Sequence, residues 1–298
     1  MKKQSSYRKK SSLKAKVFDI SCFLIVVTII SIVLLFFTNK DFANELRQVK
    51  QSKPNHFLIG VDTSLTIKPD ILQDFKEALI LRLKKFIGEK KVSYGISVFG
   101  VPGCGEEAIV NIVSSKSPQD VDSFSSDVEK KIKRISLAAR KKRADSSLPL
   151  TTPLHCFLEK ILEENRGERI LIISDLVNDD SGCRTKYLFP VEAVKQFGEN
   201  KDGQIIFFYP TPYLKGRFDT PEINKRLIDK QKDFIRTMMR FRDMGKVRVF
   251  FYKIPDDPEK RLTFFQSQLQ NSIPATFIEV AWERISKLVK TVVGAIRG

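Results

Sequence analysis

Histidine is scarce in this 298-residue chain, in which only His56 and His155 occur. Thiol and hydroxyl nucleophiles are commonly activated by a histidine, so the scarcity leaves few ways to build a catalytic dyad or triad. His155 precedes Cys156, but neighbours on a helix point about 100° apart, and we expect His155 at the solvent or at an interface. A phosphoryl-transfer enzyme with Asp62 as nucleophile would want a second carboxylate nearby, where Ser64 stands. We therefore expect a protein that is not an enzyme.

The chain also lacks a phosphate-binding loop. Its densest glycine run, residues 100–105, contains no Gly-Lys-Ser or Gly-Lys-Thr, and no helix pattern starts directly after it. We interpret this run as a turn between two strands, Val92–Phe99 and Ala108–Val113. No internal repeat or low-complexity linker follows residue 55, so one domain over residues 54–298 is the simplest count.

Cysteine is limited to four residues, and Cys22 lies inside the longest apolar run. The other three, Cys104, Cys156 and Cys183, allow at most one intrachain disulfide in an oxidising compartment, with one thiol left over. The alternative is that all three are small buried thiols. The sequence leaves both arrangements open.

Residues 20–37 form an apolar run of eighteen residues without charge, Pro or Gly, near the length of a helix that crosses a bilayer. A cleaved secretory signal would have a shorter apolar region followed by small residues, so we favour an uncleaved signal anchor. This divides the amino-terminal part into a basic cytoplasmic tail (1–18), a transmembrane helix (19–38) and a stalk (39–53).

The orientation of that anchor follows from the charges around it. Seven Lys or Arg residues precede the apolar run, and the positive-inside bias places the amino terminus in the cytoplasm. We expect a single-pass protein of the inner (plasma) membrane whose carboxyl-terminal domain is periplasmic or extracellular.

Basic residues outnumber acidic ones, and the formal net charge of +17 leaves +11 on the segment after residue 38. Apolar residues at helical spacing from Val121 to Ala139 predict a helix that is strongly basic near its carboxyl end. Its basic residues, together with those just beyond it, are Lys130, Lys131, Lys133, Arg134, Arg140, Lys141, Lys142 and Arg143. They favour binding to an anionic surface such as lipid headgroups, a cell-wall polymer or nucleic acid. The alternative is a solvated basic helix face.

The remaining apolar segments show two kinds of pattern. Continuous apolar runs predict strands buried on both faces, at Phe57–Val61, Ile170–Ser174, Ile205–Tyr209 and Val247–Tyr252. Three- and four-residue spacing predicts helices at Leu72–Phe86, Leu154–Leu162, Pro221–Met244, Glu259–Gln270 and Thr276–Arg297. This alternation predicts a mostly parallel sheet covered on both faces, which is a three-layer, doubly wound, Rossmann-like α/β fold.

Polar residues follow two of these strands and precede one of the helices. Asp62, Ser64 and Thr66 come after the first strand at every second position, Thr152 caps a helix, and Asp175 ends the strand Ile170–Ser174. In a doubly wound sheet, ligands bind beyond the carboxyl ends of the strands, where the strand order reverses. Carboxylate and hydroxyl oxygens gathered there suit a hard cation such as Mg²⁺ or Mn²⁺.

In this order, the residues resemble the motifs of the von Willebrand factor type A (VWA) family, with its metal-ion-dependent adhesion site (MIDAS). The family's Asp-x-Ser-x-Ser motif is matched by Asp62, Ser64 and, with a substitution, Thr66. Its Thr before a helix, often in Thr-Pro-Leu, is matched by Thr152. Its Asp after a hydrophobic strand is matched by Asp175.

The resemblance implies that the three hydroxyl residues hold Mg²⁺ or Mn²⁺ directly, while the two carboxylates act largely through bound water. An acidic residue of a partner protein would then complete the coordination of the ion. Leu176 stands where the family often has Gly, and the alternative is a motif that is kept for structure and binds no ion.

The leading interpretation is a membrane-anchored VWA-like domain that mediates metal-dependent protein–protein interaction or assembly of an envelope complex of adhesion, pilus, secretion or conjugation type. The alternative is a basic protein of a transfer apparatus that binds nucleic acid or an anionic surface and has a degenerate metal site.

Overall fold

The structure is a computed structural model that describes residues 55–137, 151–164, 169–180, 182–199, 203–214 and 219–273, together with Glu279, Trp282 and Ser286. The predicted tail, transmembrane helix and stalk lie outside the described residues, as does most of the predicted last helix. Among the residues that are described, no helix is long and apolar enough to span a membrane. Lys53–Val280 forms one compact unit, and the domain limits drawn from the sequence stay predictions.

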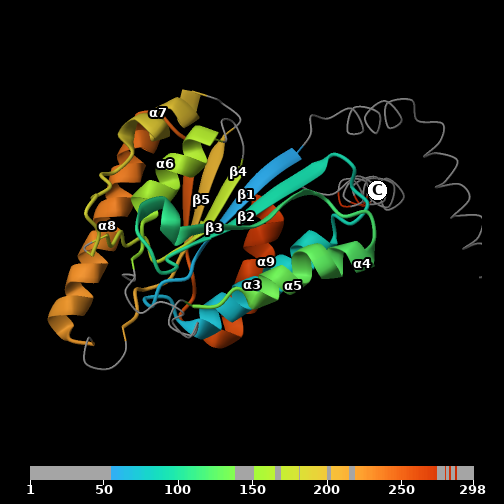
Figure 1. The fold of residues 1–298 in the computed structure, drawn as a ribbon, viewed down its shortest axis with the longest axis horizontal. Coiled ribbons are helices and arrows are strands. Elements are labelled where there is room, and N and C mark those ends of the chain that lie inside the picture. Colours follow the sequence, from blue (N-terminus) through green and yellow to red (C-terminus); the bar gives the residue numbers. More distant parts are fainter. Residues whose placement is uncertain are drawn as a thin grey trace, which may run out of the picture. The chain divides into compact units, whose positions relative to one another are not determined.

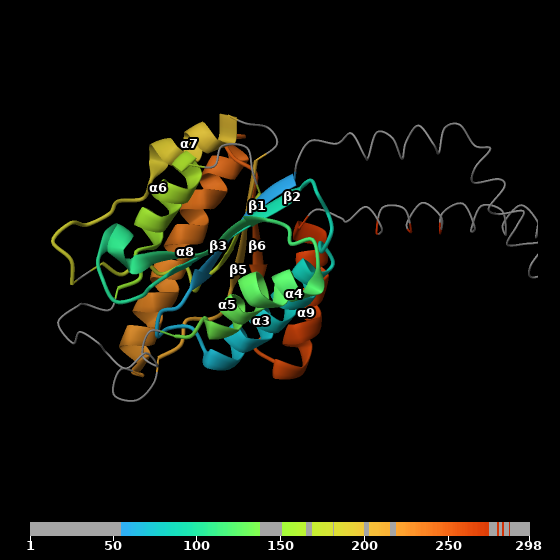
Figure 2. The ribbon, with the colours of Figure 1, turned by 45° about the vertical axis from the view of Figure 1, so that its right-hand side comes forward.

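Six strands form one sheet in the order β3-β2-β1-β4-β5-β6 (Figures 1 and 2). Their bounds are β1 (Asn55–Asp62), β2 (Val92–Phe99), β3 (Ile109–Lys116), β4 (Arg169–Ile173), β5 (Gln204–Tyr209) and β6 (Val249–Lys253). Only β3 is antiparallel to its neighbour within this sheet. Starting at β1, successive strands are added toward one edge of the sheet up to β3, and from β4 they are added toward the other edge up to β6. The strand order therefore reverses between the neighbours β1 and β4.

Helices cover both faces of the sheet (Figures 1 and 2). One face carries α3 (Pro69–Lys84), α4 (Val121–Phe124), α5 (Lys130–Arg134) and α9 (Pro258–Ser272). The other carries α6 (Leu154–Glu164), α7 (Val191–Glu199) and α8 (Pro221–Asp243). The predicted three-layer, mostly parallel α/β arrangement is confirmed. Helix α7 has no counterpart among the predicted elements, because its apolar face is limited to a few residues.

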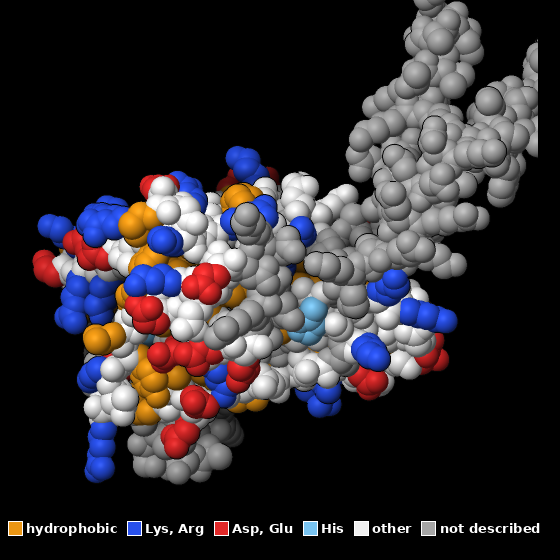
Figure 3. All heavy atoms as spheres, turned by 90° about the horizontal axis from the view of Figure 1, so that it is seen from above, with side chains coloured by type: hydrophobic (Ala, Val, Ile, Leu, Met, Phe, Trp, Pro, Cys, Tyr) orange, Lys and Arg blue, Asp and Glu red, His pale blue; other side chains and the backbone are white. Residues whose placement is uncertain are grey.

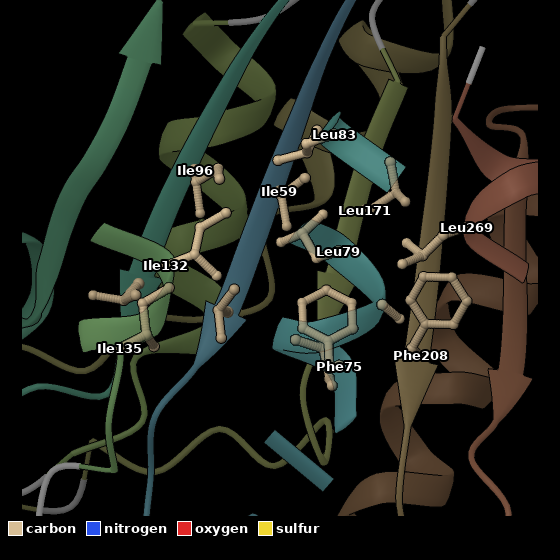
Figure 4. Close-up of a cluster of buried hydrophobic side chains, with 14 of the residues drawn as sticks. Ile59, Phe75, Leu79, Leu83, Ile96, Ile132, Ile135, Leu171, Phe208 and Leu269 are labelled. Carbon is tan, nitrogen blue, oxygen red and sulfur yellow. The ribbon is translucent and has the colours of Figure 1, made fainter. Parts of the chain in front are cut away.

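Two apolar cores hold the layers together. Figure 4 shows the first, in which Phe75, Leu79 and Leu83 of α3 lie against side chains of the central strands. In the second, the rings of Phe99 and Phe157 stack with their centroids 4.4 Å apart. A Cβ on Gly60 would lie 2.5 Å from the Phe157 ring, so the glycine lets α6 pack directly onto β1. This packing fixes the start of α6 near the end of β1.

The basic helix differs from the prediction. It is divided into α4, a wider π-helical turn η2 (Ser125–Glu129) and α5, and it ends at Arg134. Ile135 is extended and buried in the core, and the Lys76 ammonium donates to the carbonyls of Lys133 (3.1 Å) and Ile135 (3.0 Å). The predicted continuous helix to Ala139 is therefore wrong, because the chain turns into the core at this point.

The predicted anion-binding residues are only partly described. Lys130, Lys131, Lys133 and Arg134 are exposed. Arg140, Lys141, Lys142 and Arg143 lie outside the described residues. Figure 3 shows that Lys and Arg side chains are mixed with Asp and Glu side chains over the face seen there.

Candidate metal centre

The reversal of strand order brings two carboxylates together. Asp62 is the last residue of β1, and Asp175 follows the neighbouring strand β4. Both are buried, with 1% and 0% of their surface exposed. The Ser174 hydroxyl donates to Asp62 Oδ2 (2.7 Å) and the Ser64 backbone N–H donates to Asp62 Oδ1 (2.8 Å). The predicted convergence of the two strand ends is thus present.

Three hydroxyl residues line a pocket at this end of the sheet. The hydroxyl oxygens of Ser64 and Thr66 lie 2.9 Å apart. Thr152 is held by a backbone bridge in which its N–H donates to the Asp179 carbonyl (2.7 Å) and its own carbonyl accepts from the Asp179 N–H (3.0 Å). Ser64, Thr66 and Thr152 line one pocket of about 380 Å³. Hydrogen bonds thus link Asp62, Ser64 and Thr66, and Thr152 shares the pocket with the two hydroxyl residues, while the role of all five predicted residues as ligands stays a prediction.

Burial raises the pKa of both carboxyl groups above the ordinary value. For Asp62, burial outweighs the hydrogen bonds from Ser174 and Ser64, which lower its pKa. For Asp175, burial acts first and the neighbouring Asp62 charge adds to its effect on the pKa. No ion pair to either carboxylate is seen within the described part of the chain. Two adjacent buried carboxyls without a cation are costly to ionise.

One oxygen of Asp175 is left without a partner. Its Oδ1 accepts from the Val177 N–H (3.0 Å). The Thr66 hydroxyl is near enough to lower the pKa of Asp175, yet Oδ2 has no hydrogen bond of normal geometry in the described structure. An orphaned, buried carboxylate oxygen beside neutral hydroxyls fits a hard divalent cation. Within the described residues, no three His, Cys, Asp or Glu side chains form a group suited to a metal, so the fit depends on the hydroxyl residues together with the two aspartates.

Gly100 is part of this site, although the sequence pattern indicated only a turn there. Its φ is +82°, and a Cβ at this position would lie 3.0 Å from Ser64 N and 3.2 Å from Asp62 Oδ1. A side chain would therefore displace the loop from the carboxylate. The turn after β2 lies against the loop after β1 because this position is a glycine.

A disulfide joins the loops around the pocket. Cys104 and Cys183 are bonded across a sequence separation of 79, which links the turn after β2 to the segment after β4. The Thr151 hydroxyl donates to the Gly103 carbonyl (2.8 Å) and ties the start of α6 to the same turn. Cys156 remains a free, buried thiol whose pKa is raised by burial. Of the two arrangements left open by the sequence, the structure contains the disulfide.

Two further residues fix the position of Asp175. Leu176 is buried and has φ +64°, a left-handed conformation that glycine adopts with far less strain. The loop thus keeps the backbone expected of a glycine while Leu fills the core. Gln231 of α8 donates through Nε2 to the Asp175 carbonyl (2.7 Å) and the Pro210 carbonyl (2.8 Å). Nothing in the sequence around Gln231 indicated this contact.

His155 is less exposed than expected of a solvent residue, and the expectation of an interface stays a prediction. It is partly buried in α6, with its Nδ1 3.0 Å from the Tyr187 carbonyl and its ring packed against Phe189 and Phe234. Burial lowers the pKa of its imidazole. Helical spacing did not reveal this position, because segments distant in the sequence cover this side of α6.

No family model matches the chain, and no curated protein matches it. Solved structures with a similar course of the chain include a von Willebrand factor type A protein from Catenulispora acidiphila (TM-score 0.44, 11% identity) and the pilus adhesin SpaC from Lactobacillus rhamnosus GG in its open conformation (0.43, 10%). The PilB minor pilin from Streptococcus sanguinis is another (0.38, 11%).

These likenesses cover 74%, 74% and 75% of this chain, and 43%, 30% and 63% of the respective structures. The chain thus spans less than two thirds of each of them. At identities near 10% and TM-scores below 0.5, the likeness is one in the course of the chain alone.

Proposed function

We propose that this chain is a membrane-anchored VWA-like domain that binds another protein through Mg²⁺ or Mn²⁺, as a component of an envelope complex of adhesion, pilus, secretion or conjugation type. The observation that carries the proposal is the meeting of Asp62 and Asp175 at the reversal of the sheet, beside a pocket lined by hydroxyl groups. The proposed role is binding and assembly rather than catalysis.

The chemistry of the site supports an ion that stays open to a partner. The hydroxyls of Ser64, Thr66 and Thr152 would hold the ion, and the buried carboxylates would orient its water ligands and offset its charge. A bound Mg²⁺ or Mn²⁺ would supply a strongly electrophilic centre, because its direct protein ligands are neutral. A carboxylate is the protein side chain best suited to complete such a shell.

The disulfide supports the proposed location. Structural disulfides persist in oxidising compartments, and Cys104–Cys183 lies within the domain that the anchor would place outside the cytoplasm. We therefore propose a periplasmic or extracellular domain held at the inner (plasma) membrane by residues 19–38.

A capture experiment on native membranes tests this function. The full chain is immobilised in neutral detergent and exposed to solubilised membranes of its source with Mn²⁺ or with a chelator. We expect a partner that is retained with Mn²⁺, released by chelator and lost with Ser64→Ala. The exposed Ser126→Ala serves as a matched control and should retain the partner. Retention that is indifferent to both chelator and Ser64→Ala would overturn the proposal.

A further inference from the structure

We propose that the partner segment carries two acidic residues with an apolar residue between them, and that Arg226 and Lys230 of α8 bind the second acid. This inference rests on the proposed function, in which the first acid completes the shell of the ion. It adds a recognition pocket with its own residues and its own chemistry.

The pocket extends from the hydroxyl cluster to the first half of α8. Helix α8 follows β5 and begins at the edge of the sheet where β1 and β4 end (Figure 1). The residues of α8 that line the pocket are Ile223, Arg226, Leu227 and Lys230. Their spacing of three and four positions places them along one side of the helix. The volume of about 380 Å³ is enough for several side chains of a bound segment.

The two cations of the pocket are available to a ligand. Neither Arg226 nor Lys230 makes an ion pair with an acidic residue among those described. Further along α8, Arg236 pairs with Asp233 (3.1 Å) and Arg242 pairs with Asp243 (3.0 Å). Arg226 and Lys230 outnumber Asp179, the one acidic residue among the described lining, so the lining carries net positive charge. Such a pair of cations suits a carboxylate.

The apolar part of the lining explains the residue between the two acids. Leu65 lies between Ser64 and Thr66 in the loop after β1, lines the pocket and is 45% exposed. Leu214, Ile223 and Leu227 line the same pocket. An apolar side chain of the partner would cover these surfaces and gain the free energy of burial.

The walls of the pocket are held in fixed positions before any ligand binds. Gln231, next to Lys230, ties α8 to the Asp175 carbonyl. The Tyr213 N–H donates to the Thr66 carbonyl (2.9 Å), which ties the segment that contains Leu214 to the loop after β1. Walls that are already in place lower the entropic cost of binding. Because they do not adjust to the ligand, the spacing of the two acidic residues in the partner segment decides whether both can bind.

The chemistry of the lining favours a protein segment over nucleic acid. Single-stranded nucleic acid is held by aromatic platforms and a string of cations along its backbone. None of the described residues that line this pocket is aromatic, and the cations are confined to one turn of α8.

Synthetic peptides test the inference on the full chain in neutral detergent with saturating Mn²⁺. The array holds short peptides with two Asp residues separated by one to four positions, with Leu between them, and the same peptides with one Asp replaced by Asn. We expect at least one spacing to bind about tenfold more tightly than its single-acid form. The double variant Arg226→Gln/Lys230→Gln should remove this gain and leave single-acid binding unchanged. The matched control Lys225→Gln/Lys232→Gln removes the same charge from other positions of α8, outside the pocket, and should keep the gain.

The outcomes separate the pocket from the metal site. If the two-acid peptides bind no more tightly than the single-acid peptides at any spacing, the inference is wrong, whether or not the metal-dependent function holds. If both double variants lose the gain equally, general charge and not the pocket is responsible, and the inference is again wrong. Binding of anionic lipid vesicles that depends on Arg226 and Lys230 and is not displaced by two-acid peptides would assign the pocket to a lipid headgroup and overturn it. Loss of all peptide binding in Ser64→Ala, with the gain present in wild type, would support both proposals.

Discussion

Replacing Asp175 with Asn is predicted to stabilise the metal-free protein and to remove its response to Mg²⁺ or Mn²⁺. In the wild type, burial raises the pKa to about 6 for Asp62 and to about 7 for Asp175. A pKa that is one unit higher in the folded state than in the unfolded state costs about 1.4 kcal/mol of stability once the group is ionised, so the metal-free pair costs on the order of several kcal/mol near pH 8. Asparagine removes the ionisation cost of one buried carboxyl and the repulsion between the two charges.

The stabilisation expected for Asp175→Asn is reduced, because an amide replaces the carboxylate oxygen that has no hydrogen-bond partner. An amide N–H buried without an acceptor costs about 1 to 3 kcal/mol, and the net stabilisation in chelator is expected to be about 2 kcal/mol. For a domain of this size, that corresponds to a rise in Tm of about 4–8 °C. With Mn²⁺, the wild type should gain stability by mass action while Asp175→Asn gains none.

Thermal unfolding of the full chain in neutral detergent, with chelator and with millimolar Mn²⁺, measures both effects. Asp233→Asn makes the same chemical change at an exposed position of α8 and should leave Tm and the Mn²⁺ response nearly unchanged. A lower Tm for Asp175→Asn in chelator would show that the buried carboxyl does not destabilise the metal-free protein. A Mn²⁺ response equal to that of the wild type would show that Asp175 takes no part in binding the ion.

Three further outcomes follow from the same site. In chelator, the free energy of unfolding should fall as pH rises from about 5 to about 8, because a carboxyl with a raised folded-state pKa holds its proton more tightly in the folded state. Denaturant unfolding at several pH values should show a smaller fall for Asp175→Asn. Equal falls for the wild type and the variant would contradict this. The double variant Cys104→Ser/Cys183→Ser removes a bond between cysteines 79 residues apart. It should lower the free energy of unfolding by about 4 kcal/mol and weaken the Mn²⁺ response. An unchanged unfolding midpoint would exclude a stabilising role for the disulfide. Leu176→Gly relieves the strain of a left-handed backbone conformation but leaves a cavity where the buried side chain was. We expect the free energy of unfolding to fall by about 2 kcal/mol, with Mn²⁺ binding retained. Calorimetry that finds no Mn²⁺ binding would contradict this.

The parts of the site that the sequence predicted are those set by local pattern. Asp62 and Asp175 end uninterrupted apolar strands, and the parallel alternation of strands and helices places such strand ends at one edge of the sheet. Thr152 precedes a helix whose apolar face is regular. These signals depend only on neighbours in the sequence, so the sequence alone is sufficient to find them.

The parts that were missed depend on contacts between distant segments. Gln231 lies within a highly charged helix, and only packing brings it to the Asp175 carbonyl. Gly100 was predicted only as a turn residue, since its close approach to Ser64 arises from two loops meeting. The pairing of Cys104 with Cys183 was open because any two of three cysteines could have met. Helix α5 ends before the predicted position, and Ile135 packs in the core just after its end. The spacing of apolar residues in the sequence does not show where a helix stops for this reason.

Calorimetric titration of Mn²⁺ into the full chain in neutral detergent measures whether the site formed by Asp62, Ser64 and their neighbours holds a metal ion. We expect one bound ion per wild-type chain near neutral pH, and no binding by Asp62→Ala or Ser64→Ala when circular dichroism shows that both remain folded. Heats that are indistinguishable between the wild type and these two variants would contradict the claim that the site holds a metal ion.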